Sequence, residues 1–372
     1  MMIAGEASGD LHGSGVVRAL KERLPAVEVF GIGGDNMKRE GMELLQHISG
    51  LSFMGFVEVV RNLRKISALE QEMHAVLVVR KPDVVVLIDY PGFNLRFARR
   101  VKKLGIPVLY YISPQVWAWN KGRVKKMKHL VDRMKVVFPF EVEIYRKEGI
   151  DVEFVGHPIV ERIGSSTTRD EFLRARDLDL SKKLVGLFPG SRLQEIERIY
   201  PVMLETAVEL QRKFDVQIAV GVAPNLGKGV LREFAPEGSS VVMVENATYD
   251  LMCHADAAIV TSGTATLETG WFGTPMVVVY RTSPITFFIG RLLVDVPSIG
   301  LVNIVAGKKV VPEFIQHEMR TDKLVQAVGK ILSDENVARE MRNGLSVIKA
   351  KLGGPGASAR VADGIISLGR AA

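Results

Sequence analysis

A glycine turn that could bind phosphate lies near the middle of the chain. In "LVGLFPGSRLQEI", Gly190, Ser191 and Arg192 separate an apolar run from an amphipathic stretch. A strand, a glycine turn and a helix in this order direct free backbone N–H groups and the helix dipole at an anion. Arginine can then fork onto phosphate oxygens. We expect a phosphate site here; the alternative is a capped helix with a solvated arginine.

The segment "TSGTATLE", residues 261–268, repeats this design. Ser262, Gly263 and Thr264 are small enough to let the backbone approach a ligand, and the carboxylate of Glu268 could bind ribose hydroxyls. The alternative is a capping box in which Thr264 caps the helix. Together the two turns predict a site for a nucleoside diphosphate.

A third glycine turn, "GEASGD", lies near the start of the sequence and contains Glu6, Ser8, Gly9 and Asp10. Its carboxylates would repel a pyrophosphate and suit sugar hydroxyls better, although a purely structural turn is the alternative. Neither this turn nor "GIGGDNM" completes the G-x-G-x-x-G fingerprint, so a nicotinamide domain is weakly supported.

Asp89 ends the apolar run "PDVVVLID" and is followed by "YPGFN", which contains Asn94. A carboxylate at the carboxyl end of a parallel strand can act as a general base. We place Asn94 beside it, in the predicted acceptor region. A helix N-cap or a loop-bracing role is the alternative for Asp89.

Other polar residues suggest no metal site. His157 precedes Pro158 and is interpreted as a turn residue rather than a catalyst. Asp177 and Asp179 form a D-x-D string in a charged region before a strand, so we expect solvated carboxylates. No other cluster has metal-ligand spacing.

The elements that would position these residues alternate along the chain, because short β-branched runs are separated by longer amphipathic stretches. This pattern predicts an α/β protein with two doubly wound parallel sheets. A short first strand is expected at Met1 to Ala4, before the first glycine turn. The other candidate strands lie in "VEVFGIGG", "PDVVVLID", "PVLYYIS" and "MKVVFPF", and then in "LVGLFPG", "VQIAVGV", "SVVMVE", "AAIVTSG" and "PMVVVY". The domains are predicted at residues 1–160 and 181–350, with a linker at 161–180 and a final helix within 351–372 that could pack back on the first domain.

The composition fits an ordinary globular protein of 372 residues, with 47% hydrophobic and 24% charged residues. No run is long and apolar enough for a membrane span, and no signal peptide is visible, so we expect a cytoplasmic protein. The single cysteine, Cys253, argues against a disulfide or a cysteine-based metal site. A net charge of +7 favours an anionic partner: nucleic acid, an acidic membrane or a phosphorylated ligand.

One basic and apolar stretch, residues 54–69, could form a helix on an anionic bilayer. Its membrane-facing residues are predicted to be Val57, Val60, Arg61, Leu63, Arg64 and Lys65, with Ile66 continuing the apolar spacing. Residues 121–135 add a second basic cluster, and "ITFFIGRLLV" adds apolar bulk. For each segment the alternative is a core-packed helix with a solvated basic face.

A set of motifs spread over residues 1–316 resembles those of the bacterial lipid-A-disaccharide synthase family. They are "GEASGDLHGSG", "GIGGDNM", "MGFVEV", "IDYPGFN", "YYISPQVWAWN", "FPFEVEIY", "FVGHP", "FPGSRLQEI", "TSGTATLE", "PMVVVYR" and "VPEFIQ". The resemblance implies a GT-B type glycosyltransferase, in which two Rossmann-like domains face a cleft and no metal or other cofactor is needed.

The implied reaction transfers the sugar of UDP-2,3-diacylglucosamine to 2,3-diacylglucosamine 1-phosphate. It inverts the anomeric centre and gives a β-1,6-linked disaccharide 1-phosphate and UDP. The resemblance further implies a peripheral enzyme on the anionic cytoplasmic face of the inner membrane, and we allow for a homodimer.

Carried over residue by residue, the resemblance makes Asp89 the essential aspartate and places Arg192 near the donor. Ser262, Gly263, Thr264 and Glu268 fall in the nucleotide-sugar segment, and Asn303, Glu313 and Gln316 lie in the matching "LVNIVAG" and "VPEFIQ" segments. One departure is Gly92, which stands where the family often has a second acidic residue. The resemblance therefore implies that this second carboxylate is not required here.

Two rival functions remain open from the sequence. Another UDP-sugar enzyme of the same architecture, such as an N-acetylglucosaminyltransferase or a 2-epimerase, would not depend on acyl chains. An RNA-binding protein would fit the basic charge, but no RRM, KH or zinc pattern is present, so we expect no nucleic-acid partner.

Overall fold

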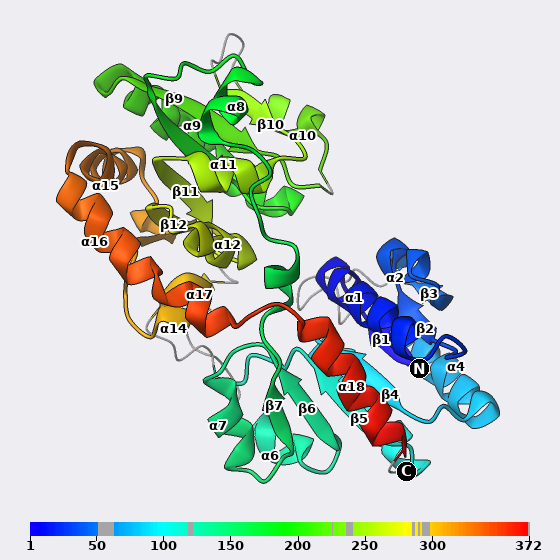
Figure 1. The fold of residues 1–372 in the computed structure, drawn as a ribbon. Helices are drawn as coiled ribbons and strands as arrows, with labels where there is room; N and C mark the ends of the chain where they lie inside the picture. Colours follow the sequence, from blue (N-terminus) through cyan, green and yellow to red (C-terminus); the bar gives the residue numbers. More distant parts are fainter. Residues whose placement is uncertain are drawn as a thin grey trace. The chain divides into compact units, whose positions relative to one another are not determined.

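The computed structural model describes residues 1–50, 63–117, 122–224, 226–235, 241–284, 287–288, 291 and 298–370. The chain divides into two compact units (Figure 1). The first unit contains residues 1–161 and 352–372, and the second contains residues 162–351.

The first unit is built on a seven-stranded sheet in the order β3-β2-β1-β4-β5-β6-β7. All neighbouring strands pair in parallel. The strands are β1 (Met2–Ala4), β2 (Phe30–Gly33), β3 (Glu43–His47), β4 (Val85–Ile88), β5 (Val108–Tyr111), β6 (Arg133–Val136) and β7 (Val152–Phe154). The strand order reverses between β1 and β4, which is where open α/β sheets bind ligands.

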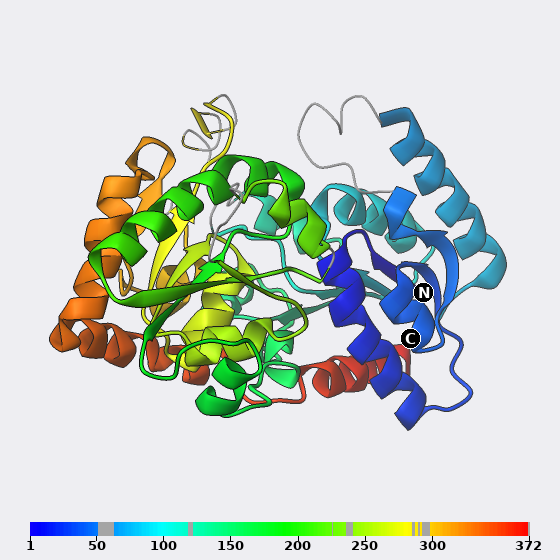
Figure 2. The ribbon, with the colours of Figure 1, turned by 90° about the horizontal axis from the view of Figure 1, so that it is seen from above.

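Helices cover both faces of this sheet, so its central strands are apolar throughout rather than alternating. The helices are α1 (Ala7–Arg23), α2 (Asp35–Arg39), α4 (Leu63–Arg80), α5 (Pro91–Lys103), α6 (Arg123–Met127), α7 (Glu141–Arg146) and α18 (Ala357–Arg370), with short 3₁₀ turns η1 (Ile48–Gly50) and η2 (Pro158–Glu161). Leu87 packs in one core cluster with Met73 of α4 and Phe97 of α5. On the opposite face, α18 lies along α1 (Figures 1 and 2).

The second unit repeats the topology in a six-stranded parallel sheet, ordered β10-β9-β8-β11-β12-β13. Its strands are β8 (Lys183–Phe188), β9 (Val216–Gly221), β10 (Val242–Val244), β11 (Ala257–Thr261), β12 (Met276–Tyr280) and β13 (Glu313–Ile315). Its helices are α8 (Arg169–Arg174), α9 (Leu193–Lys213), α10 (Lys228–Arg232), α11 (Thr248–His254), α12 (Thr264–Phe272), α14 (Leu301–Ala306), α15 (Thr321–Ser333), α16 (Glu335–Leu345) and α17 (Val347–Leu352), with a 3₁₀ turn η3 (Gln316–Glu318). The order reverses between β8 and β11.

The predicted fold class is confirmed, since both units are doubly wound parallel α/β folds. Three strands were not predicted, namely β3, β7 and β13. Residues 162–180 belong to the second unit, where the capping box of Thr168 and Glu171 starts α8.

Among the described helices, none is both long and apolar enough to cross a bilayer.

Candidate active site

Asp89 lies directly after β4, at the point where the strand order of the first sheet reverses. Asp89 and Tyr90 both have a left-handed φ of 46°, a conformation that is costly for residues other than glycine and that clusters at functional sites. The turn is fixed by the backbone of Asp89, whose N–H donates to the Tyr111 carbonyl at 3.0 Å. The Asp89 carbonyl accepts from the Tyr110 hydroxyl at 2.5 Å and from the Asn94 amide at 2.7 Å.

The buried environment of Asp89 changes the acidity of its side chain. Burial raises the pKa of Asp89 to about 6, and the nearby negative charge of Glu6 adds to the rise. A carboxylate with a raised pKa is a stronger base and is still largely ionised at neutral pH. Asp89 therefore has the properties of a general base held on a rigid turn.

Asn94 supports Asp89 from behind rather than facing solvent. Its side chain is fully buried on the first turn of α5 and also donates to the Ile88 carbonyl at 3.2 Å. We predicted Asn94 beside the acceptor; the structure gives it a role in holding the Asp89 turn.

The glycine turn after β1 leads into α1 and approaches the same strand end. Gly5 packs against the Tyr90 ring, because an added Cβ would lie 2.2 Å from a ring carbon. Glu6 is the N-cap residue of α1 without a side-chain cap bond, Ser8 is exposed, and Gly9 is buried against Ala4.

Asp10 is buried by contrast, at 2% exposure. Its carboxylate accepts hydrogen bonds from the backbone N–H groups of Gly34, Asn36 and Met37, at 2.7, 3.1 and 3.0 Å, and from the Asn36 amide. Asp10 thus caps the first turn of α2, which is the structural alternative for this residue, while Glu6 and Ser8 stay accessible.

In the second unit, the turn Gly190–Arg192 connects β8 to α9. Gly190 has φ of +106°, and an added Cβ there would lie 2.7 Å from the Glu195 carboxylate. The Arg192 side chain is 54% exposed and pairs with Glu195 one helical turn later, at 2.9 Å. The first N–H groups of α9 have no partner within the helix, so this turn offers backbone donors and an exposed guanidinium.

Sequence reasoning missed the companions of Arg192. Burial and the Glu195 carboxylate raise the pKa of Tyr280, while the charges of Arg192 and Arg198 lower it, so these side chains gather at the end of β12. Their signal was the i, i+3 spacing of residues 192, 195 and 198 on one face of a helix.

The turn after β11 leads into α12 and has no side-chain cap. Gly263 occupies the N-cap position and Thr264 is the first helical residue, so the alternative in which Thr264 caps the helix is wrong. Thr266 instead donates back to the Gly263 carbonyl at 2.8 Å. An added Cβ at Gly263 would meet no atom within 4 Å, which leaves the space beside this backbone open.

Glu268 lies on the next turn of α12. It accepts a hydrogen bond from the Tyr249 hydroxyl at 3.2 Å, and burial raises its pKa. A carboxyl in this state can accept from, or share a proton with, a neighbouring hydroxyl.

Asn303 and Glu313 are hydrogen-bonded to each other and hold the loop at residues 299–300, which contacts Ser262. The Glu313 carboxylate accepts from the N–H groups of Ile299 and Gly300, both at 3.0 Å, and from the Asn303 amide at 2.8 Å. The Ser262 hydroxyl donates to the Ile299 carbonyl at 2.9 Å.

Gln316 forms a similar contact with the chain after β12, because its amide bonds both the N–H and the carbonyl of Thr282. The polar atoms of Asn303, Glu313 and Gln316 are thus engaged with the protein. The structure gives these three residues a part in shaping the loops beside α12.

A buried carboxyl that the sequence analysis did not single out is Glu141, which links two of the quoted motifs. It accepts from the Ser113 hydroxyl at 2.7 Å, the Trp117 indole at 3.3 Å and the Phe138 N–H at 3.1 Å. Burial raises its pKa to about 7. Glu141 therefore joins "SPQVW" to "FPFE" beside the first sheet.

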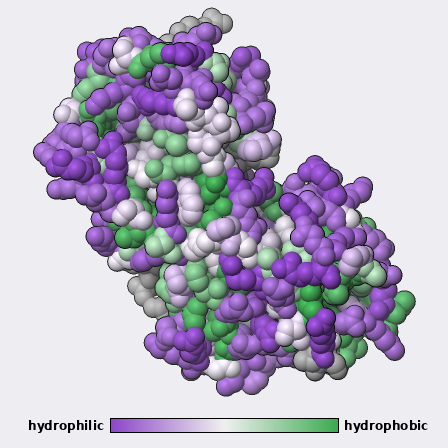
Figure 3. Space-filling view, viewed as in Figure 1, coloured by the Kyte–Doolittle hydropathy of each residue, from purple (hydrophilic) through white to green (hydrophobic). Residues whose placement is uncertain are grey.

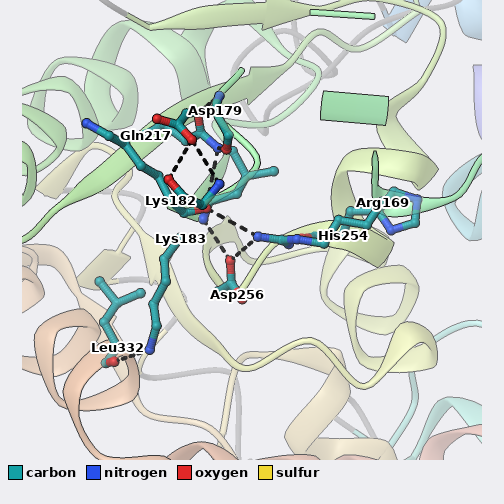
Figure 4. Close-up of polar contacts among 10 residues, drawn as sticks. Arg169, Asp179, Lys182, Lys183, Gln217, His254, Asp256 and Leu332 are labelled. Carbon is teal, nitrogen blue, oxygen red and sulfur yellow. Dashed lines mark hydrogen bonds and ion pairs between the residues drawn. The ribbon is translucent and has the colours of Figure 1, made fainter. Parts of the chain in front are cut away.

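His157 and Asp179, which we considered as a turn residue and as a metal ligand, have structural partners. Burial lowers the pKa of His157 to about 3, and its Nδ1 accepts from the Ile159 N–H. Asp179 is exposed and its carboxylate accepts from the Ser181 hydroxyl, while its backbone pairs with Gln217 near the Arg169–Asp256 ion pair (Figure 4). Within the described ranges, no cluster of His, Cys, Asp or Glu could hold a metal ion.

The predicted membrane helix is described only from α4 onward. Val57, Val60 and Arg61 lie outside the described residues, as does the side chain of Leu63. Arg64 and Lys65 are exposed, but Ile66 is 7% exposed and packs in the core of the first unit. The apolar spacing at Ile66 therefore marks the core face of α4, which agrees with the core-packed alternative for this part of the segment.

Comparison with known proteins identifies relatives along the whole chain. The family model described as lipid-A-disaccharide synthetase matches residues 1–354. The lipid-A-disaccharide synthase of Geobacter sulfurreducens is 45% identical over 99% of this chain and 96% of its own length. That of Myxococcus xanthus is 39% identical over 99% of this chain and 97% of its own.

Solved structures share the fold at low sequence identity. MurG of Acinetobacter baumannii has a TM-score of 0.60 at 15% identity, covering 99% of this chain and 98% of its own. CalG4, the calicheamicin glycosyltransferase, has a TM-score of 0.64 at 14% identity, covering 99% and 96%. A UDP-GlcNAc 2-epimerase from Neisseria meningitidis, bound to UDP-GlcNAc, has a TM-score of 0.66 at 14% identity, covering 98% and 99%. These likenesses establish the GT-B architecture.

Proposed function

This chain belongs to the lipid-A-disaccharide synthase family, and we propose the residues through which it performs that family's reaction. It is a UDP-sugar-dependent glycosyltransferase of lipid A biosynthesis. It joins UDP-2,3-diacylglucosamine to 2,3-diacylglucosamine 1-phosphate and releases UDP with the β-1,6-linked disaccharide 1-phosphate.

Asp89 is the proposed general base. It takes the proton of the acceptor 6-hydroxyl while that oxygen forms a bond to the donor anomeric carbon and the bond from this carbon to the UDP oxygen breaks. The observation that carries this role is the fixed, left-handed turn that holds a buried carboxylate with a pKa of about 6 at the end of β4. Tyr110 and Asn94 are positioning residues, since they bond the Asp89 carbonyl and not its carboxylate.

The UDP group is proposed to bind at the strand reversal of the second sheet. Arg192 and the N-terminal N–H groups of α9 and α12 would meet the charge that develops on the leaving diphosphate, as preorganised donors do in other active sites. Ser262, Gly263, Thr264 and Glu268 would line the nucleotide sugar, while Asn303, Glu313 and Gln316 hold the adjoining loops. Glu6 and Ser8 remain our candidates for the acceptor side.

The test is UDP release from UDP-2,3-diacylglucosamine, with and without the acylated acceptor, by the wild type and by Asp89→Asn. We expect acceptor-dependent release that persists in EDTA. Loss of a general base should lower turnover by about 10² to 10⁴, while UDP affinity, measured by calorimetry, stays unchanged. If Asp89→Asn loses affinity and turnover together, the residue is structural.

We also propose that the enzyme associates with the anionic cytoplasmic face of the inner membrane, because both substrates carry acyl chains. Exposed Arg64 and Lys65 at the start of α4 support this, as does Val79 on the same helix, which is 80% exposed. On the face drawn in Figure 3, hydrophobic residues form small patches among hydrophilic ones, which suits contact through charge and a limited apolar segment. A homodimer remains a prediction.

Flotation with vesicles tests this association. Binding should rise with the fraction of anionic lipid and fall between low and high salt, because exposed charges are screened. Replacing both Arg64 and Lys65 by Ser should weaken flotation at low salt. Binding that is indifferent to lipid charge and salt would contradict a basic contribution.

A further inference from the structure

A basic groove runs along α5, starting at the first turn of this helix. It consists of two adjoining cavities of about 240 and 370 Å³ that share Arg96 and Arg99. The smaller cavity is lined by Pro91 and Gly92, which follow Asp89 closely in the chain, and by Arg123, Lys126 and Leu130. The groove therefore begins where the proposed base ends its strand.

The positive charge of this groove is only partly neutralised. Glu70, with a side chain 7% exposed, pairs with both Arg96 and Arg100 at 2.6 Å. Among the described residues, neither Arg99 nor Lys126 has a hydrogen-bond or ion-pair partner. Buried Glu70 thus orients two arginines, and Arg99 and Lys126 carry positive charge that an anion could neutralise.

The groove is also linked electrostatically to Tyr110, one of the residues that hold the Asp89 turn. The charge of Arg123 reaches the buried hydroxyl of Tyr110, where it lowers a pKa that burial raises more strongly. That hydroxyl donates to the Asp89 carbonyl.

We propose that this groove binds the phosphate monoester of the acceptor, with Arg99 and Lys126 as its specificity-determining contacts. This inference rests on the proposed function, which supplies an acceptor bearing a 1-phosphate with close to two negative charges at neutral pH. Arginine and lysine form charge-assisted hydrogen bonds to phosphate. Holding the phosphate in the groove orients the sugar so that its 6-hydroxyl can approach Asp89.

The experiment compares two acceptors in detergent micelles, 2,3-diacylglucosamine 1-phosphate and the same lipid without phosphate. The proteins are the wild type, Arg99→Gln, Lys126→Gln and Lys125→Gln. Lys125 is an exposed residue of α6 that lines neither cavity. Lys125→Gln therefore removes one positive charge from the same helix as Lys126→Gln, but outside the groove.

We expect the wild type to prefer the phosphorylated acceptor in kcat/KM. Arg99→Gln and Lys126→Gln should each lower kcat/KM for that acceptor by about tenfold or more, which corresponds to the loss of one charged hydrogen bond. For the acceptor without phosphate, the groove variants should change kcat/KM by less than twofold. The Lys125→Gln control should change kcat/KM for either acceptor by less than twofold, and no variant should change UDP affinity.

Equal losses on both acceptors, or an equal effect of Lys125→Gln, would overturn the proposal. So would groove variants that keep the phosphate preference but lose binding to phosphatidylglycerol vesicles, since the groove would then serve lipid headgroups. Acceptor binding without donor, measured by calorimetry, separates this inference from the reaction itself. A wild type that binds the phosphorylated acceptor through Arg99 and Lys126 but transfers no sugar would contradict the proposed function and uphold the groove.

Discussion

At the scale of single residues, the chemistry depends on how burial changes the carboxyl groups. Asp89, Glu141 and Glu268 all have a pKa raised by burial, whereas the pKa of exposed Asp179 is lowered by its bonds to Ser181. Asp89 differs from the other two raised carboxyls because the side chains of Tyr110 and Asn94 bond its backbone carbonyl, and the hydrogen bond that its carboxylate receives comes from the Tyr90 backbone. Neither of these two side chains occupies the carboxylate, which can therefore take a substrate proton.

The raised pKa of Asp89 predicts a specific pH dependence of the reaction. Only the ionised form can accept a proton, so kcat/KM should fall as pH drops through about 6, rather than through the ordinary value of 3.8. The measurement is a pH profile of kcat/KM in the free enzyme. Because the acceptor phosphate also titrates near pH 6, the control is the residual activity of Asp89→Asn, which should lack the part of the inflection that belongs to Asp89. An inflection near pH 4 would contradict the buried environment.

At the scale of elements, both sheets place a glycine turn and a helix N-terminus at the reversal of strand order. In the second unit this position is shared by the turns after β8 and β11, which precede α9 and α12. The same arrangement in both units explains why each presents its polar residues at the carboxyl edge of an otherwise buried sheet.

Helix α9 offers a matched test of its N-terminus. Arg192 and Arg212 each pair with a glutamate three residues away at 2.9 Å, but only Arg192 lies at the N-terminal turn. Arg192→Gln should weaken UDP binding by about tenfold or more, whereas Arg212→Gln should leave it unchanged. Titration calorimetry with UDP measures both, and equal affinities in the two variants would exclude Arg192 from the diphosphate site.

The central strands could be predicted from the sequence, but three of the four edge strands could not; the exception is β10, an apolar edge strand. Strands such as β4 and β11 are fully buried apolar runs. The missed strands β3, β7 and β13 all lie at sheet edges. They are short and partly exposed, so they carry no continuous apolar run.

In the candidate site too, features with a local sequence signal could be predicted, and long-range contacts could not. The turns at Gly190 and Gly263 and the aspartate after β4 were predicted because glycines and polar residues after apolar runs have a local signal. The bonds of Asp10 to residues 34–37, and of Glu313 to residues 299 and 300, had none. They join segments that are far apart in the chain, and only the tertiary structure shows which polar atoms are already occupied.

At the scale of the whole molecule, the first unit is closed by a helix from the far end of the sequence. Glu161 accepts from the N–H and the hydroxyl of Ser358 at 2.8 and 2.6 Å, which caps the start of α18. On α1, an added Cβ at Gly15 would lie 2.4 Å from the same hydroxyl. The close approach of α1 and α18 therefore depends on this glycine.

Gly15→Ala should destabilise the first unit, although alanine favours helix by up to about 1 kcal/mol. The methyl group must displace Ser358 from Glu161, and such overpacking costs about 1–3 kcal/mol. Gly92→Ala is the control, since Gly92 lies in α5 with no atom within 4 Å of an added Cβ. Hydrogen exchange read by mass spectrometry should show faster exchange in α1 and α18 for Gly15→Ala only; unchanged protection would mean that the contact contributes little.

The late position of α18 also bears on how the protein is made. The strands of the first unit leave the ribosome early, but α18 follows only after residues 162–351 have been synthesised. At about 5 to 20 residues per second, that interval is roughly 10 to 40 s. During it, Leu109 and the side of α1 near Gly15 lack the helix that covers them in the finished structure. The nascent chain thus has an uncovered apolar face for chaperones to bind, while the continuous second unit can fold as soon as it emerges.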